Sequence, residues 1–456
     1  MLHKKHRVHF VGIGGIGMSG IAEVLVNLGY VVTGSDLQDS EATRRLRALG
    51  AQVFVGHQEE NLAANPSVVV ISTAVKYANP EVLEARRRHI PVIPRAEMLA
   101  ELMRMKYGVA VAGSHGKTTT TSMVAAVLSS AGLDPTLVIG GRVHMFGTNA
   151  KMGQGDILVA EADESDGSFL LLAPTIAVVT NIDREHMDFH QTMERLNESF
   201  LTFVNKIPFY GLAVLCLDNA NVRSLLAKVR KRFTTYGLSA EADFSAQDLK
   251  MKAAEIEFTV LHRAKSLGKL RLHLPGRHSA TNALAAVAVA HELEIPFSHV
   301  AEALDAFTGI HRRFEIKGEP KGVLVIDDYG HHPVEIAATI GAIRDSWKRP
   351  LTVIFQPHRY SRTRDLFDEF LTAFEGADRL VLTEIYAAGE DAIPGVSGES
   401  LYQAVKRKGH LDIEFVPDKS QIVPSLAGRL RGGDVVLTLG AGDIYKVGEA
   451  LLEALK

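Results

Sequence analysis

The stretch VAVAGSHGKTTTT at residues 109–121 decides how the central part of this chain folds. An apolar run typical of a β-strand breaks into Gly-Ser-His-Gly-Lys-Thr at 113–118 and then enters a sequence that favours a helix. Glycines let backbone N–H groups approach anionic oxygens, the lysine adds a positive charge, and the helix N-terminus adds its dipole. The loop is shorter than the usual Walker pattern, which would have a glycine at Val111. We predict a phosphate loop here; a plain turn before a helix is the alternative.

A second glycine-rich loop lies near the N-terminus, within RVHFVGIGGIGMSGIAEVLVNLGYVVTGSD at residues 7–36. A short strand leads into a Gly-x-Gly-x-x-Gly motif at 12–17, a helix follows, and a second strand ends at Asp36. This βαβ pattern is the fingerprint of a dinucleotide or nucleotide-diphosphate site, in which the loop holds the diphosphate and the acid a ribose or base edge. A structural glycine turn is the alternative. Glu23 and the lack of a small-residue cleavage site argue against a secretory signal.

The composition fits a protein with several nucleotide-binding domains. A length of 456 residues corresponds to about three domains of roughly 150 residues each. No apolar run is long enough to span a membrane, and a net charge of -3 provides no basic field that would attract nucleic acid. The single cysteine, Cys216, cannot form an internal disulfide, which suits a reducing compartment. We expect a cytoplasmic protein with no membrane or nucleic-acid partner.

Short apolar runs alternate with amphipathic stretches along the chain, which predicts α/β domains with largely parallel sheets. Strands are expected at these apolar runs: 68–74, 156–163, 175–183, 323–328, 351–358, 378–384 and 434–442. A helix is expected at 280–294, and a polar, glycine-bearing hinge at 309–320. We place the domains at residues 1–106, 107–310 and 311–456.

Acidic side chains follow two strands that should lie beside the phosphate loop, in EADESD (161–166) and TNIDREHMD (180–188). At the carboxyl edge of a parallel sheet, a carboxylate can hold Mg²⁺ against phosphate oxygens, and a neutral imidazole can bind a second cation. A solvated acidic loop with an incidental histidine is the alternative.

The third part of the chain carries DDYGHHP (327–333), FQPHRYSRTRD (355–365) and LGAGDIYK (439–446), each after an apolar run. A lone histidine usually has no catalytic task. Two histidines and two arginines at one sheet edge, however, would form a cationic rim that can hold a carboxylate-bearing substrate.

Eight segments resemble, in order, the motif series of the bacterial Mur amino-acid ligases: GIGGIGMSGIAEVL, GSHGKTTTT, EADESD, TNIDREHMD, GRHSATNALAA, HRRFE, DDYGHHP and FQPHRYSRT. The resemblance covers nearly the whole chain. It implies an N-terminal UDP-binding Rossmann-like domain, a central P-loop-type ATPase domain with a mixed sheet, and a C-terminal Rossmann-like domain. It also implies that ATP drives the joining of L-alanine to the carboxylate of UDP-N-acetylmuramate through an acyl phosphate, in peptidoglycan precursor synthesis. The closest rival is the sister ligase that attaches a recycled peptide to the same UDP-sugar, but its first glycine motif differs.

The resemblance implies roles for individual residues. The ATP-binding residues are Gly113, Ser114, His115, Gly116, Lys117, Thr118, Thr119, Asn282 (adenine), Arg313 (phosphates) and Asp328 (ribose). The UDP-sugar-binding residues are Gly12, Gly14, Gly15, Gly17, Asp36, Ser72 and Thr73. The pocket for L-alanine and the lactyl carboxylate is formed by Tyr329, His331, His358, Arg359 and Arg362. Two Mg²⁺ ions, which Mn²⁺ can replace, are bound by Thr118 with Glu161 and by His186 with Glu161. Ser279 stands where the family commonly has Asn, and the resemblance leaves open what replaces a contact made by that amide.

In this chemistry Lys117 neutralises charge on the transferred phosphoryl group, and the attacking amine must lose a proton. His331, His358 or solvent can accept that proton, and the sequence does not choose between them. Since water destroys an acyl phosphate, closure at the hinge should precede chemistry. A nicotinamide dehydrogenase would use the loop at 12–17 and leave the loop at 113–118 without purpose. A nucleotide switch would need no amino acid. Selectivity among L-Ala, Gly and L-Ser stays open, as does the choice between monomer and homodimer.

Overall fold

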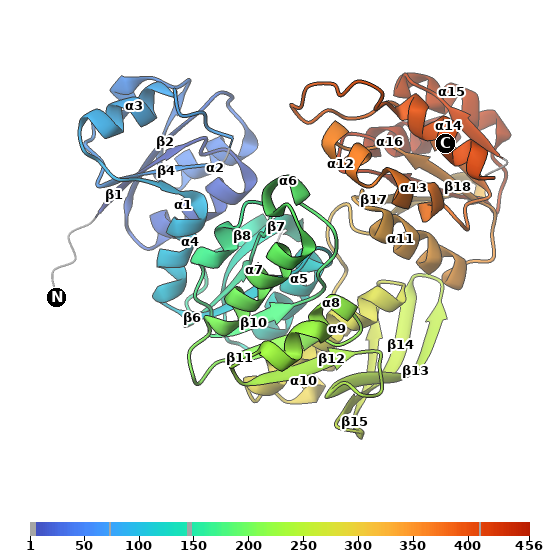
Figure 1. Cartoon of the computed structure of the whole chain (residues 1–456), viewed down its shortest axis with the longest axis horizontal. Helices are drawn as coiled ribbons and strands as arrows, with labels where there is room; N and C mark the ends of the chain where they lie inside the picture. The colour runs from blue at the N-terminus through green and yellow to red at the C-terminus, as the bar shows by residue number, and fades with distance from the viewer. Residues whose placement is uncertain (1–5, 73, 144–147, 410–411) are drawn as a thin grey trace. The chain divides into compact units, whose positions relative to one another are not determined.

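The computed structural model describes residues 6–72, 74–143, 148–409 and 412–456. They form three sheets covered by helices, which confirms the expected three-domain α/β class (Figure 1). Contacts within the chain divide it into two compact units. The first holds residues up to Gln247 together with 260–268 and 281–306, and the second holds 248–259, 269–280 and 307–456. In the described residues no helix is long and apolar enough to cross a membrane.

The first sheet is fully parallel, with strand order β3-β2-β1-β4-β5. Its strands are β1 (Arg7–Val11), β2 (Val31–Asp36), β3 (Gln52–Val55), β4 (Val68–Ile71) and β5 (Val92–Pro94). Its helices are α1 (Ile16–Asn27), α2 (Glu41–Ala48), α3 (Pro80–Arg87) and α4 (Arg95–Arg104). The strand order reverses between β1 and β4, and ligands of such sheets bind beyond the carboxyl ends of the strands at that point. The glycine loop after β1 lies there.

The second sheet has ten strands in the order β15-β14-β13-β12-β11-β10-β6-β9-β7-β8, and it is mixed because β7 and β8 pair antiparallel. Its strands are β6 (Tyr107–Ala112), β7 (Thr136–Val143), β8 (Thr148–Lys151), β9 (Ile157–Glu161), β10 (Ile176–Val179), β11 (Leu212–Cys216), β12 (Phe233–Gly237), β13 (Phe244–Lys252), β14 (Glu255–His262) and β15 (Lys265–Leu272). In this sheet the sequence indicated β6, β9 and β10, and it did not indicate β7, β8 or the strands from β11 to β15.

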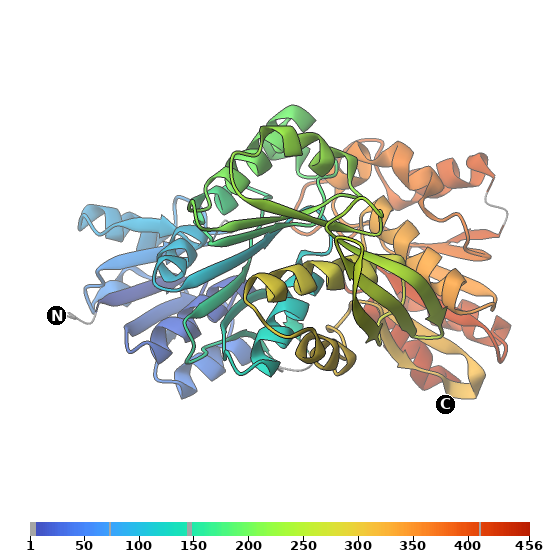
Figure 2. The same ribbon diagram turned by 90° about the horizontal axis from the view of Figure 1, so that it is seen from below.

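Helices cover this second sheet on both faces. They are α5 (Lys117–Ser130), α6 (Met187–His190), α7 (Met193–Asn205), α8 (Ala220–Leu225), α9 (Arg277–Glu292) and α10 (Phe297–Asp305). Figure 2 shows the green helix α7 on one face and the yellow helix α9 on the other. The helix expected at 280–294 is α9.

The third sheet has the order β16-β17-β21-β18-β19-β20 and is parallel except for the pair β16 and β17. Its strands are β16 (Glu315–Gly318), β17 (Leu324–Asp328), β18 (Leu351–Phe355), β19 (Arg379–Leu382), β20 (Ile413–Phe415) and β21 (Val435–Leu439). Its helices are α11 (Pro333–Ser346), α12 (Tyr360–Asp365), α13 (Phe367–Ala373), α14 (Gly398–Lys408), α15 (Ile422–Leu426) and α16 (Tyr445–Leu455). Part of the segment expected as a hinge therefore forms edge strand β16, and hinge motion stays a prediction.

All seven apolar runs expected to be strands carry one: β4, β9, β10, β17, β18, β19 and β21. The strands are a few residues shorter than the runs, because the polar and glycine residues at the ends of each run already belong to loops.

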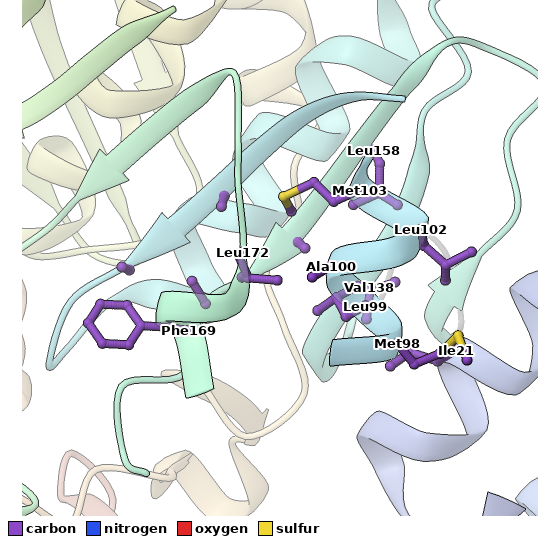
Figure 3. Close-up of a cluster of buried hydrophobic side chains, with 14 of the residues drawn as sticks. Ile21, Met98, Leu99, Ala100, Leu102, Met103, Val138, Leu158, Phe169 and Leu172 are labelled. Carbon is purple, nitrogen blue, oxygen red and sulfur yellow. The ribbon is translucent and has the colours of Figure 1, made fainter. Parts of the chain in front are cut away.

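Helix α4 contributes a large share of the apolar core of the first unit (Figure 3). Met98, Leu99 and Met103 are all buried and belong to the same hydrophobic cluster as Ile21 of α1 and Leu158 of β9. Their spacing along α4 places them on one side of the helix, as expected for an amphipathic helix packed on a sheet. Helix α4 thus ties together core residues from distant parts of the sequence.

We expect Leu99→Ala to lower the free energy of unfolding by about 2–5 kcal/mol, because it leaves a cavity in a close-packed core. The exposed Glu101 on the same helix is the control, and Glu101→Ala should change stability by less than about 0.5 kcal/mol. Urea unfolding of both variants measures the difference. Equal stability of the two variants would show that α4 does not pack as described.

Candidate active site

The phosphate loop lies between β6 and α5, where the backbone packs too closely for any residue but glycine. Gly113 has a φ of +138°, and a Cβ there would lie 2.0 Å from Thr180 Oγ1. Gly116 is left-handed with a φ of +76°, and a Cβ would lie 2.8 Å from Asn282 Oδ1. The backbone N–H of the residue before Gly116, His115, donates to Asn181 Oδ1 at 2.7 Å. The strand, loop and helix predicted from the sequence are therefore present, and the loop is held by the residues that follow β10.

Lys117 is the first residue of α5, and its ammonium lies within the loop. Its Nζ donates to Gly113 O at 2.6 Å and lies 2.9 Å from Glu164 Oε2. Burial by itself would lower the pKa of Lys117, but Glu164 and the acidic residues beside it raise the pKa above its usual value. Burial raises the pKa of Glu164, and Lys117 partly offsets this effect. The sequence singled out the segment of Glu164 but did not identify it as the partner of the lysine.

Thr118 and Glu161 come together beside the lysine. The Thr118 hydroxyl donates to Glu161, at 3.0 Å from Oε2 and 3.2 Å from Oε1. A hydroxyl and a carboxylate are oxygen ligands of the kind that Mg²⁺ prefers. The structure therefore brings together the two residues expected to hold the first cation.

His186 belongs to the same acidic cluster. It precedes α6 in a left-handed conformation with a φ of +56°, and its Nε2 lies 3.9 Å from Glu164 Oε1. Asp163 adds a further carboxylate: burial would raise its pKa, but the charge of Lys117 and the hydrogen bonds from Ser165 together outweigh burial, and the pKa is lowered. Carboxylates thus outnumber the cationic groups described around them, and a cluster with excess negative charge suits a bound cation.

The N-terminal glycine loop is closed by its own βαβ unit. Gly12 N and Ile13 N both donate to Ser35 O, at 2.8 and 2.9 Å. Gly14 N donates to Asp36 Oδ2 at 2.8 Å. Asp36, expected at a ribose or base edge, therefore also fixes the loop. Ser72, at the end of β4, lies next to Gly12, since a Cβ at Gly12 would be 3.6 Å from Ser72 Oγ.

The first turn of helix α1, which contains Gly17, has a cationic neighbour that the sequence did not reveal. A Cβ at Gly17 would lie 2.7 Å from Arg95 Nη1, so the glycine lets the guanidinium approach the helix backbone closely. Gly15 is the N-cap of α1. Thr73, expected to bind the UDP-sugar, lies outside the residues that the structure describes.

A second feature near this loop that the sequence did not reveal is a buried carboxylate. Glu81, at the start of α3, is fully buried and accepts hydrogen bonds from Ser35 Oγ at 2.6 Å, from His9 Nε2 at 3.3 Å and from Asn61 Nδ2. Burial would raise its pKa, but these hydrogen bonds outweigh burial and lower it. The backbone carbonyl of Ser35 accepts the hydrogen bonds that hold the glycine loop. Glu81 therefore stabilises the loop indirectly, by binding the hydroxyl of the same serine. A lone glutamate in no motif gave no signal of this.

Four of the five residues expected in the amino-acid pocket are in contact with one another in the second unit. The rings of Tyr329 and His331 are 5.6 Å apart, and those of His331 and His358 are 5.8 Å apart. Arg362 Nη1 lies 3.1 Å from His358 Nδ1. The fifth, Arg359, precedes α12, and its guanidinium faces Glu390 at 4.0 Å.

Asp328 and Arg313 lie beside this group. Both oxygens of the Asp328 carboxylate accept backbone N–H groups, from Phe314 and Gly330, each at 2.7 Å. Burial raises the pKa of Asp328 to about 6, against the opposing effect of Arg313. The Arg313 guanidinium lies 5.0 Å from the centre of the Tyr329 ring. Asp328, expected at the ATP ribose, therefore also shapes two loops of the second unit.

Two residues near the start of α9 were expected to differ in role. Ser279 Oγ donates to Pro275 O at 2.9 Å, so this serine makes a local bond to the segment just before α9. Asn282, expected at adenine, is buried beside Gly116 of the phosphate loop.

Three family models match the chain in sequence order. They are the Mur ligase family catalytic domain over residues 7–107, the Mur ligase middle domain over 111–290, and the Mur ligase glutamate ligase domain over 312–442.

Several full-length relatives carry the same name. The chain is 59% identical to the UDP-N-acetylmuramate--L-alanine ligase of Geobacter sp. (strain M21), over 100% of this chain and 99% of the relative. It is 57% identical to the protein of that name in Geotalea uraniireducens (strain Rf4), with the same coverage. The crystal structure of UDP-N-acetylmuramate-alanine ligase from Thermotoga maritima matches with a TM-score of 0.81 and 30% identity, covering 98% of both chains. A murein peptide ligase from Psychrobacter arcticus shares the fold, with a TM-score of 0.70 and 24% identity over 99% of this chain and 98% of that one.

We expect Gly14→Val to weaken binding at the N-terminal glycine loop. A Cβ at Gly14 would lie 2.9 Å from Asp36 Oδ2 and 3.0 Å from Thr43 Cγ2, so the side chain would break the bond that closes the loop. Affinity for a UDP-sugar should fall about ten-fold or more while ATP affinity stays nearly constant. Isothermal titration measures both affinities.

Gly428→Ala is the control for this substitution, because nothing lies within 4 Å of the added Cβ. An equal loss of ATP affinity in a folded Gly14→Val variant would mean that the two glycine loops have been assigned to the wrong ligands.

Proposed function

We propose, from the premise that the chain belongs to the Mur ligase family, that it joins L-alanine to the carboxylate of UDP-N-acetylmuramate and converts ATP to ADP and phosphate. The observation that carries this is the agreement along the entire chain with relatives that bear the name of that activity. The peptide ligases among the solved structures are more distant, so attachment of a recycled peptide is not favoured. The product is a peptidoglycan precursor.

The reaction needs an activated carboxylate, because a carboxylate oxygen is a poor leaving group for an amine. Transfer of the γ-phosphoryl group of ATP gives an acyl phosphate, and such transfer depends mainly on positioning and charge neutralisation. We assign neutralisation to Lys117, at the N-terminus of α5. Thr118 and Glu161 would hold one Mg²⁺ and His186 with Glu161 a second, and Mn²⁺ would substitute. When bound, these ions offset the negative charge of the phosphates and of the sugar carboxylate.

Before nucleotide binds, the ammonium of Lys117 is paired with the carboxylate of Glu164. An ammonium buried without a partner is strongly unfavourable, and Glu164 at 2.9 Å supplies the partner before nucleotide binds. The phosphates of ATP carry more negative charge than one carboxylate, so they would draw the lysine from Glu164. The other ATP contacts proposed are the loop residues Ser114, His115 and Thr119, with Asn282, Arg313 and Asp328.

The UDP-sugar is proposed to bind at the N-terminal loop, through its backbone and through Ser72, Thr73 and Asp36. Its diphosphate would lie at the N-terminus of α1, where the helix dipole favours an anion. Arg95 adds a positive charge beside Gly17 that suits a diphosphate.

The amino acid is proposed to bind at Tyr329, His331, His358, Arg359 and Arg362. Guanidinium groups pair with carboxylates in a planar, two-bond geometry, which suits the carboxylate of L-alanine. We further propose that the enzyme acts in the cytoplasm, as a monomer or a homodimer, and that a movement at residues 309–320 accompanies turnover.

The test is to incubate the protein with UDP-N-acetylmuramate, ATP, Mg²⁺ and one acceptor at a time: L-alanine, glycine, L-serine or the recycled tripeptide. Phosphate release should require all components and should be fastest with L-alanine. Mass spectrometry should then find the UDP-sugar heavier by one alanyl residue. Preferential use of the tripeptide would replace this function with that of the sister ligase.

The matched control for this assay is Lys117→Ala. Removing the cation from the phosphate loop should lower turnover by about 100-fold or more, because electrostatic stabilisation is a large term in phosphoryl transfer. Binding of the UDP-sugar, measured by titration, should stay near normal. A variant with substantial activity would contradict the assignment of the loop.

A second variant tests the proposed metal role of His186. His186→Ala should raise the Mg²⁺ concentration that half-saturates acyl-phosphate formation, which is measured without alanine by trapping with hydroxylamine. Excess Mn²⁺ should partly restore the rate, since Mn²⁺ accepts nitrogen ligands. Binding of Mn²⁺ in the presence of ADP, followed by electron paramagnetic resonance, should also weaken. Unchanged Mn²⁺ binding and unchanged trapping would leave His186 with only a structural role.

A further inference from the structure

The loop at residues 383–397, between β19 and α14, lies against the segment that carries Arg359. Arg359 N donates to Tyr386 O at 2.9 Å, and Tyr386 N donates to Pro357 O at 2.8 Å. These two backbone bonds form a short parallel bridge between the loop and the segment after β18. The Tyr386 ring also lies nearly parallel to the His358 ring, at 5.6 Å and 9°. The loop therefore contacts two of the residues proposed to bind the amino acid.

Arg359 has an unusual backbone conformation, with a φ of +70° and a ψ of 139°. Residues with a side chain rarely adopt such a conformation, and it persists only where neighbouring groups hold it. Besides the bond from Arg359 N to Tyr386, the carbonyl of Arg359 accepts from Thr363 N at 3.2 Å and from Thr363 Oγ1 at 2.8 Å. The direction in which the guanidinium leaves the backbone thus depends on contacts to α12 and to the loop at 383–397.

Glu390 lies on the same loop and binds the start of α12. Its Oε2 accepts from Ser361 N at 3.0 Å, and its Oε1 accepts from Ser361 Oγ at 2.6 Å. In the sequence Ser361 stands between Arg359 and Arg362, the two arginines of the amino-acid pocket. A contact to Ser361 therefore fixes the backbone segment from which both guanidinium groups extend.

A carboxylate at this place can act in two ways: through its charge, on Arg359, or through its hydrogen bonds, on Ser361. Arg359 Nη1 is 4.0 Å from Glu390 Oε1, which is longer than a hydrogen bond, and the Arg359 side chain is 45% exposed, so solvent screens the charge. The two bonds to Ser361 are at hydrogen-bond distance. One of them satisfies an N–H of the first helical turn, which has no acceptor within the helix. The hydrogen bonds to Ser361 are therefore the stronger effect.

We propose that Glu390 is a positioning residue for the amino-acid pocket: by binding Ser361, it holds Arg359 and Arg362 where they pair with the carboxylate of L-alanine. This role rests on the proposed function. Glu390 acts through Ser361 and not on the substrate. Its loss should therefore weaken the use of L-alanine and leave the earlier step, formation of the acyl phosphate, unchanged.

The test compares Glu390→Ala with Glu390→Gln. In Glu390→Ala both bonds to Ser361 are lost, and the KM for L-alanine should rise about ten-fold or more, with a much smaller change in kcat and in the KM for ATP. A glutamine amide offers one acceptor and one donor, so it can accept from Ser361 N and donate to Ser361 Oγ. Glu390→Gln should therefore bring the KM for L-alanine back to within about three-fold of wild type, although the charge is gone.

Ser361→Ala is a second variant, which removes the hydroxyl and keeps the backbone N–H. Its KM for L-alanine should also rise, by a smaller factor than in Glu390→Ala, because one of the two bonds remains. Asp391→Ala, an exposed acid next to Glu390 on the same loop, is the control and should not differ from wild type.

Trapping with hydroxylamine, in the absence of L-alanine, measures the acyl-phosphate step alone and should proceed at nearly the wild-type rate in Glu390→Ala. If Glu390→Ala loses trapping as well, it has lost its fold, and Ser361→Ala then decides. The proposal is overturned if Glu390→Gln raises the KM for L-alanine as much as Glu390→Ala does, since the charge would then matter and not the bonds to Ser361. It is also overturned if folded Glu390→Ala, or Ser361→Ala, keeps the wild-type KM for L-alanine. Failure of the wild-type protein to use L-alanine would instead refute the proposed function.

Discussion

The close approach of the phosphate loop to the residues after β10 is the constraint on which the central site depends. Strands β10 and β9 pair with β6 on its two sides, with Val179 opposite Ala112 and Glu161 opposite Val111. The loops that follow these three strands therefore start side by side. A Cβ at Gly113 would lie 2.0 Å from Thr180, so glycine lets the loop reach one neighbour while Glu161 arrives from the other. Strand order and one glycine together place the lysine, the hydroxyl and the acids.

The same arrangement explains why so many carboxylates are tolerated in a small volume. Lys117 lies among them with most of its side chain buried, and Glu164 and its acidic neighbours raise its pKa. Like charges at these distances repel unless cations intervene. In a metal-bound nucleotide, the negative phosphates can pair with the lysine and the divalent cations can pair with the carboxylates. The charge pattern of the protein is therefore complementary to such a ligand.

Much of this was predictable from local sequence, and the rest was not for physical reasons. Buried parallel strands such as β6 and β10 are continuous apolar runs, and glycine loops are local motifs, so both can be recognised along the chain. Strand β13 is buried only over its first three residues and is exposed or half-buried over the rest, which resembles a polar loop. Glu81 and Arg95 act on partners far away in sequence, Ser35 and Gly17, and nothing in their own neighbourhood in the sequence signals those contacts.

The pair of histidines marks the limit of sequence reasoning most clearly. His331 and His358 both follow an apolar strand, and by sequence they are equivalent candidates for accepting a proton. In the structure their surroundings differ: a carbonyl oxygen lies beside His331 Nδ1 and a guanidinium lies beside His358 Nδ1. Because an imidazole has one proton to place when neutral, the neighbour of one nitrogen decides the chemistry of the other. Two identical side chains at one sheet edge thus lie in different surroundings, and neither the apolar strands before them nor the motifs around them show this difference.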